Sequence, residues 1–122
     1  MRRVLVILGA LAAIAVTVIL ANVVAFVRLQ SRNMRMAGDH VPEVLAVTRD
    51  DRRFDEVTFE PYTNGNGCLG VFGTVASEAD LTELKRRVEG TNPPVSVDWH
   101  VYVASVTRPA TSAASAPSAG RR

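Results

Sequence analysis

The stretch "NGNGCLGVFGTV", residues 64–75, holds four glycines in twelve residues, and its interpretation determines which fold the chain is expected to adopt. A glycine-rich loop that cradles a phosphate follows a strand, leads into a helix N-terminus and usually carries a lysine. Here the glycines precede an alternating apolar run, and no lysine follows them. We therefore interpret the stretch as a β-hairpin turn and a strand, because Asn-Gly pairs supply the positive φ that tight hairpin turns need. The structural turn residues are Asn64, Gly65, Asn66, Gly67 and, within the strand, Gly73.

The hairpin extends to both sides of this turn. Before it, "FDEVTFEPYT" alternates, with Val57 and Phe59 on one face, which is typical of a half-buried strand. Pro61 cannot donate to a ladder, so this strand lies at an edge or ends there. After the turn, residues 68–75 predict a second strand in which Gly70 and Gly73 mark places where another element packs closely.

A helix and a third strand follow. Ser77 predicts an N-cap, and Leu81, Leu84 and Val88 form one apolar helical face. Gly90 fits the C′ position, and two prolines forbid continuation. Residues 95–103, "VSVDWHVYV", alternate again and predict a strand.

The first helix of the domain is predicted just before the hairpin. We expect a break at Gly38-Asp39, a cap at Asp39 or His40, and Pro42 in the first turn of a new helix. A short strand over "VLAVT" is the alternative, because its residues are partly β-branched. The resulting order, helix-strand-strand-helix-strand, predicts a two-layer α+β domain with a three-stranded sheet.

This order resembles the BON domain, a small α/β module of bacterial envelope proteins. The resemblance covers residues 42–104: Asn66-Gly67 gives the turn, Leu69 and Val71 the apolar positions, and Gly73 with Val75 the Gly-x-Val ending. The segment "TNPPVSV" and Trp99 depart from the family pattern. The resemblance implies binding to phospholipid surfaces or other envelope proteins, and no catalysis.

The N-terminal segment predicts a membrane anchor. Residues 4–27 contain no charged side chain, and as a helix they span about 36 Å, enough to cross a hydrocarbon layer of about 30 Å. A cleaved signal peptide is the alternative, but its apolar core is usually shorter. We expect an anchor over residues 1–30, a juxtamembrane linker over 31–41, the domain over 42–106 and a disordered Ala/Ser/Pro tail over 107–122.

Small residues recur at every fourth position of the anchor. Gly9 and Ala13 begin this row, which lets helices approach closely and predicts a homodimer within the membrane, although any Ala-rich anchor can show such a row by chance. The positive charges on the two flanks of the anchor are nearly equal in number, so they do not set its orientation. We expect the domain outside the cytoplasm because an N-terminal anchor followed by a single small domain most often exports that domain.

Charge distribution argues against nucleic acid as a partner. Between Met36 and Thr107 there are 12 acidic and 6 basic residues, whereas a nucleic-acid site needs a basic face. Arg28, Arg32 and Arg35 lie beside the anchor, where they can contact the bilayer surface or a partner.

No constellation in the sequence predicts an enzyme, a metal site or a cofactor. Cys68 is the single cysteine and is expected as a small buried strand residue, with pairing between chains as the alternative. Asp98 and His100 share a strand face but lack a third ligand. Trp99 is expected in the core, or as an interface anchor if its face is incompletely covered. We expect a non-catalytic envelope protein that binds another envelope protein or the membrane surface, or an accessory subunit that assembles through its transmembrane helix.

Overall fold

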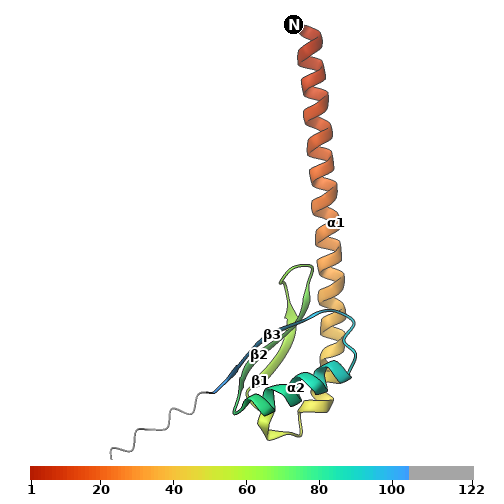
Figure 1. The fold of residues 1–122 in the computed structure, drawn as a ribbon. Coiled ribbons are helices and arrows are strands. Elements are labelled where there is room, and N and C mark those ends of the chain that lie inside the picture. Colours follow the sequence, from red (N-terminus) through yellow and green to blue (C-terminus); the bar gives the residue numbers. More distant parts are fainter. Residues whose placement is uncertain (105–122) are drawn as a thin grey trace, which may run out of the picture.

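The structure is a computed structural model that describes residues 1–104, and it is an α+β fold preceded by a long helix (Figure 1). The predicted tail lies outside the described residues. The elements, in chain order, are α1 (Arg2–Thr48), the 3₁₀ helix η1 (Arg52–Phe54), β1 (Val57–Tyr62), β2 (Cys68–Val75), α2 (Glu78–Gly90) and β3 (Val97–Val103).

Helix α1 is continuous, so the predicted break at Gly38-Asp39 is wrong. Residues that the sequence assigned to a linker are helical, and Pro42 lies inside the helix instead of in its first turn. Tertiary packing overrides the local signals, because Ala37, His40 and Val44 are buried against the domain. Gly38 has a packing role: a Cβ there would lie 3.3 Å from the Pro61 side chain, so the glycine lets β1 approach the helix.

The sheet has three strands in the order β1-β2-β3. Strands β1 and β2 are antiparallel, with Phe59 opposite Val71, and β2 and β3 are parallel, with Val71 opposite Trp99. Helix α2 forms the crossover that a parallel pair requires. Pro61 therefore lies in an edge strand, as its missing N–H predicts.

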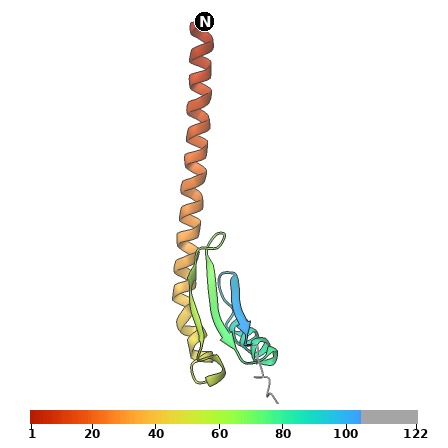
Figure 2. The same cartoon turned by 90° about the vertical axis from the view of Figure 1, so that its left-hand side faces the viewer.

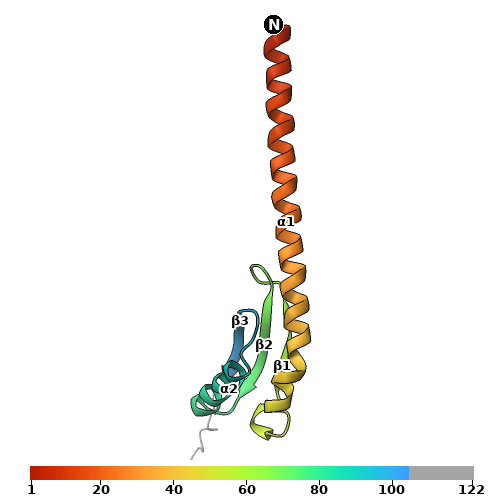
Figure 3. The ribbon, with the colours of Figure 1, turned by 90° about the vertical axis from the view of Figure 1, so that its right-hand side faces the viewer.

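Both helices pack on one face of the sheet (Figures 2 and 3). The C-terminal half of α1 covers β1 and β2, and α2 covers β2 and β3. The shared core consists of buried apolar side chains from all these layers: Ala37, Val44, Phe54, Val57, Leu69, Val71, Val75, Leu84 and Val88. The two-layer arrangement and the apolar faces predicted for β2 and α2 are confirmed.

The ends of α2 match the sequence prediction at one end only. Ser77 caps the helix, because its hydroxyl accepts a hydrogen bond from the Asp80 N–H at 3.2 Å. At the other end Gly90 is the last helical residue, and the left-handed backbone conformation is found at Asn92, with φ 54°. Asparagine tolerates this conformation better than most side chains, so it ends the helix in place of the glycine.

Two core contacts were not predicted. Phe54 in η1 is buried, with the Arg53 and Arg87 guanidinium groups each 5.3 Å from its ring centroid. The expected helix cap His40 instead lies inside α1, where its Nε2 is 2.8 Å from the Thr91 hydroxyl. This contact joins α1 to the end of α2.

Candidate functional site

The N-terminal half of α1 touches no other part of the described chain. Its apolar side chains are exposed all round, and its most apolar 18-residue window has a mean hydropathy of 3.0 with none of it buried. By length and composition the helix can cross a membrane, a property shared by signal sequences. Gly9 and Ala13 lie in this half, and, its own helical turn aside, no described residue has an atom within 4 Å of the place a Cβ would take on Gly9.

The hairpin loop, residues 63–67, is fastened to α1 shortly after the apolar run ends. Gln30 Nε2 donates hydrogen bonds to the carbonyl oxygens of Thr63 and Gly65 at 3.1 and 3.2 Å. Asn33 Nδ2 donates to the carbonyl of Asn66 at 2.9 Å. The loop is thereby held against the helix at three of its carbonyl oxygens.

Glycine makes this close approach possible. Gly65 and Gly67 have φ values of 58° and 88°, which side chains rarely adopt. A Cβ on Gly67 would also lie 2.8 Å from the Gln30 carbonyl oxygen. The turn is a five-residue loop and not a two-residue one, because β1 ends at Tyr62 and β2 begins at Cys68.

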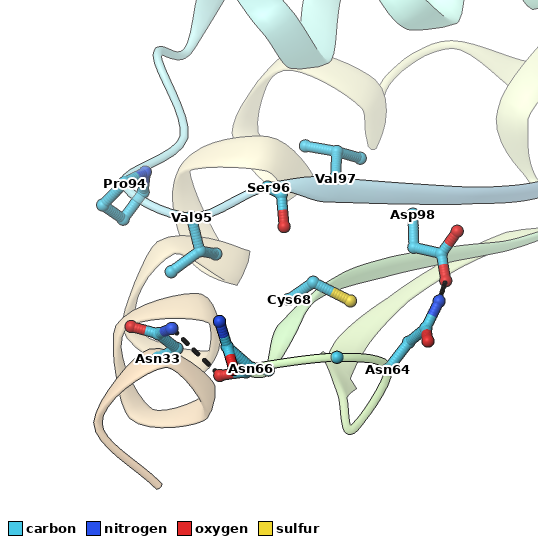
Figure 4. A pocket seen from close by; sticks show the side chains of 11 residues that line it. Asn33, Asn64, Asn66, Cys68, Pro94, Val95, Ser96, Val97 and Asp98 are labelled. Atoms are coloured by element: carbon cyan, nitrogen blue, oxygen red, sulfur yellow. Dashed lines mark hydrogen bonds between the residues drawn. The ribbon is translucent and has the colours of Figure 1, made fainter. Parts of the chain in front are cut away.

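A polar groove of about 450 Å³ lies between this loop and the segment that leads into β3 (Figure 4). Asn33 and Asn66 lie at one end, and Asn64 and Asp98 at the other. Cys68 and the Ser96 hydroxyl lie between the two ends. The groove is therefore built from three separate parts of the chain, brought together by the docking of the loop on α1.

Hydrogen bonds hold Asp98 in its ionised form. Asn64 Nδ2 donates to Asp98 Oδ2 at 2.7 Å, and His100 Nε2 lies 3.0 Å from the same oxygen. Both interactions lower the pKa of Asp98, with the Asn64 bond the larger cause. Burial raises the pKa of the neighbouring Cys68 thiol, which keeps it protonated and poorly nucleophilic.

The sheet face opposite the helices carries a small aromatic cluster. Phe72 and His100 stack with centroids 5.0 Å apart, and the Tyr62 ring meets both edge to face. The Phe72 ring covers Gly70, where a Cβ would collide with it. Asp98 lies on this face beside His100, so the groove and the cluster share one hydrogen-bonded pair.

The residues singled out in the sequence do not form one site. The loop residues Asn64–Gly67 and Cys68 line the groove, and Cys68 is buried, as predicted. Trp99 is partly buried on the helix-covered face, with the Lys85 amino group 5.6 Å from its ring centroid. Arg28, Arg32 and Arg35 are exposed along α1.

No pattern in the sequence indicated a role for Gln30, Asn33 and Ser96. Their role depends on the continuous helix and on the parallel β2–β3 pairing, which bring residues 30–33, 63–68 and 94–98 together. Gly67 is the residue that came closest to a signal for this contact, because a glycine that the turn itself does not require indicates that another backbone segment approaches closely.

Comparison with protein-family models, with curated proteins and with solved structures finds no match to this chain.

Proposed function

We propose that this chain is a single-pass membrane protein that presents a BON-like, non-catalytic interaction domain outside the cytoplasm. One observation carries the proposal: a fully exposed apolar half-helix continues without a break into the domain core. Exposed apolar surface of this extent is stable only in hydrocarbon or against a partner. The BON-like assignment is supported by the αββαβ order and by the Gly73-x-Val75 ending of β2.

The partner we propose is another envelope protein. The domain's excess of acidic residues opposes docking on anionic headgroups. Arg28, Arg32 and Arg35 are the basic groups nearest the end of the apolar run, and they are available to headgroups or to an acidic partner. The full chain, held in one vesicle population, is tested for its ability to capture a second population of anionic vesicles. Strong capture contradicts our preference for a protein partner over the membrane surface.

The anchor and its orientation are tested together. We expect the protein to remain in the membrane fraction after alkaline carbonate extraction, with no shortening of the chain. A reporter that is active only outside the cytoplasm, fused after Arg108, is expected to be active. Release by carbonate contradicts the anchor, and activity only of a cytoplasmic reporter contradicts the orientation.

An accessory subunit that assembles through its transmembrane helix is the second candidate. The row of small residues that begins at Gly9 and Ala13 favours it, because the row turns away from the domain's side of α1 between Gly9 and Thr17. At about 100° per residue, Gly9, Ala13 and Thr17 lie about 80°, 120° and 160° around the helix from the buried Ala37. A second helix, from another protein or from a second copy, can therefore pack there without meeting the domain.

Exchanging the anchor discriminates between the two candidates. Function retained behind an unrelated transmembrane helix favours the domain as the binding element, and function lost favours the anchor. For self-association, Gly9→Ile with Ala13→Ile is expected to weaken dimerisation in a bilayer. Unchanged association of this variant contradicts the homodimer.

A further inference from the structure

The groove beside the hairpin loop has the construction of a ligand site. Its volume of about 450 Å³ lies within the range of about 300–1,000 Å³ typical of small-molecule sites. Its walls are fixed before any ligand arrives, since Gln30 and Asn33 hold the loop and Asn64 holds Asp98. A preformed site loses little entropy when it binds.

The groups in the groove select the chemistry of the ligand. Among the residues that the structure describes, no lysine or arginine lines it, and Asp98 is ionised, so a phosphate or other anion is repelled. Among residues 1–104, the Ser96 hydroxyl, the Asn66 amide group and the Asn64 Oδ1 atom make no hydrogen bond to another protein group. The groove thus offers both donors and acceptors, which is what hydroxyl groups require because each hydroxyl donates and accepts.

A cationic amine fits the groove less well. An ammonium group only donates, and it needs a carboxylate with unused acceptor capacity. The Asp98 Oδ2 atom already accepts from Asn64 and lies 3.0 Å from His100 Nε2, so an ammonium group is limited to the remaining acceptor positions of this one carboxylate. The mixed set of amides and one hydroxyl is better matched to an uncharged polyhydroxyl compound.

The height of the groove along α1 places it near the bilayer surface, a step that rests on the proposed membrane anchoring. The apolar run ends at Val27, and Asn33 lies six residues further along, about 9 Å at 1.5 Å per residue. The headgroup layer is about 5–7 Å thick on each side of the hydrocarbon. The groove therefore opens at the outer boundary of the headgroups, within reach of a group that projects from a lipid.

We propose that this groove binds an uncharged saccharide, either free or carried as the headgroup of a glycolipid. Asn33 and Asn66 contact it at one end, Asn64 and Asp98 at the other, and Ser96 between them. The continuous helix fixes the groove at a constant height above the anchor.

The test uses the full ¹⁵N-labelled chain and three probes: tri-N-acetylglucosamine, maltotriose and glucosyl diacylglycerol. The two free trisaccharides are titrated onto the chain in detergent micelles, which tests the groove even if the anchoring proposal fails. The glycolipid is added to nanodiscs that hold the same chain. We expect amide shift changes confined to residues 63–67 and 94–98 with at least one probe.

Matched variants assign the binding to the groove. Asn66→Ala keeps the backbone carbonyl that Asn33 holds, and Ser96→Ala removes only the hydroxyl, so both are expected to fold and to bind about 3- to 10-fold more weakly. Ser31→Ala, on α1 outside the groove, is the control and should bind normally.

The outcomes separate the sources. Shifts with a free trisaccharide indicate a free glycan, and shifts only with the glycolipid indicate a headgroup. The proposal is overturned if no probe shifts these residues, or if Asn66→Ala and Ser96→Ala bind as tightly as the unaltered chain.

Discussion

The two halves of α1 belong to one helix but are built for different surroundings. In the first half, apolar side chains cover the whole circumference and all are exposed. In the second half, Ala37, His40, Val44 and Thr48 are buried at intervals of three or four residues, and the remaining positions are polar or partly exposed. The change from a uniform to an amphipathic pattern marks where the domain begins, whereas Gly38 and Pro42 do not mark a boundary of the helix.

The largest test of this contrast places one aspartate in each half. Val44→Asp buries an unpaired carboxylate at a fully buried position and is expected to cost about 4 kcal/mol or more, enough to unfold so small a domain. Val16→Asp, in the exposed half, is expected to leave the domain folded and to weaken membrane insertion by about 2.5–3.5 kcal/mol. Trp99 fluorescence reports folding, because it is the single tryptophan, and carbonate extraction reports insertion.

The two halves act separately if Val44→Asp unfolds the domain without preventing insertion and Val16→Asp weakens insertion without unfolding the domain. If Val16→Asp unfolds the domain, or if Val44→Asp leaves Trp99 fluorescence unchanged, the two halves do not act separately.

A glycine of the domain and a glycine of the apolar half of α1 are expected to respond differently to substitution by alanine. Gly73 has φ 137°, and a Cβ there would collide with the Glu56 carbonyl oxygen, so Gly73→Ala is expected to cost about 2–3 kcal/mol in the free energy of unfolding. Gly9→Ala lies in a helix and, outside its own turn, meets no atom of the described residues, so the domain should keep its stability. Urea unfolding of the two variants, followed by Trp99 fluorescence, measures the difference. Equal stability of both variants contradicts the strained conformation of Gly73.

Much of the domain could be predicted because local and global signals agree. The alternation around Val57 and Val71, the Ser77 cap and the spacing of Leu84 and Val88 each follow from one element's own period. The prediction failed at Gly38 and Pro42, where tertiary burial of Ala37 and Val44 outweighs two helix-breaking residues. The groove could not be predicted, since it requires three distant segments in a known register.

Pro42 offers a prediction of the opposite sign. It is exposed and lies inside α1, where its ring leaves the Gly38 carbonyl without the usual N–H partner. Pro42→Ala restores that donor and is expected to stabilise the domain by about 1–3 kcal/mol. Urea unfolding of the full chain in micelles measures this, with Pro94→Ala, in the loop before β3, as the control that should not gain. A loss of stability in Pro42→Ala would mean that a bend at Pro42 is needed for α1 to follow the sheet.

Acid sensitivity is the smallest expected effect, and it separates the domain from the apolar half of α1. Side-chain bonds from Arg53 lower the pKa of Asp51 to about 2, and those from Arg86 and Arg87 lower the pKa of Glu83 to about 2. Both carboxylates therefore stabilise the folded domain above their ordinary pKa of about 4, and this contribution is lost as the pH falls towards 2. Asp51→Asn with Glu83→Gln should flatten the decline in urea midpoint between pH 5 and 2.5, modestly because these groups are partly exposed. The apolar half, residues 4–27, holds no carboxylate, so helicity there should stay constant over the same range. An unchanged decline in the double variant would assign the acid sensitivity to other carboxylates of the domain.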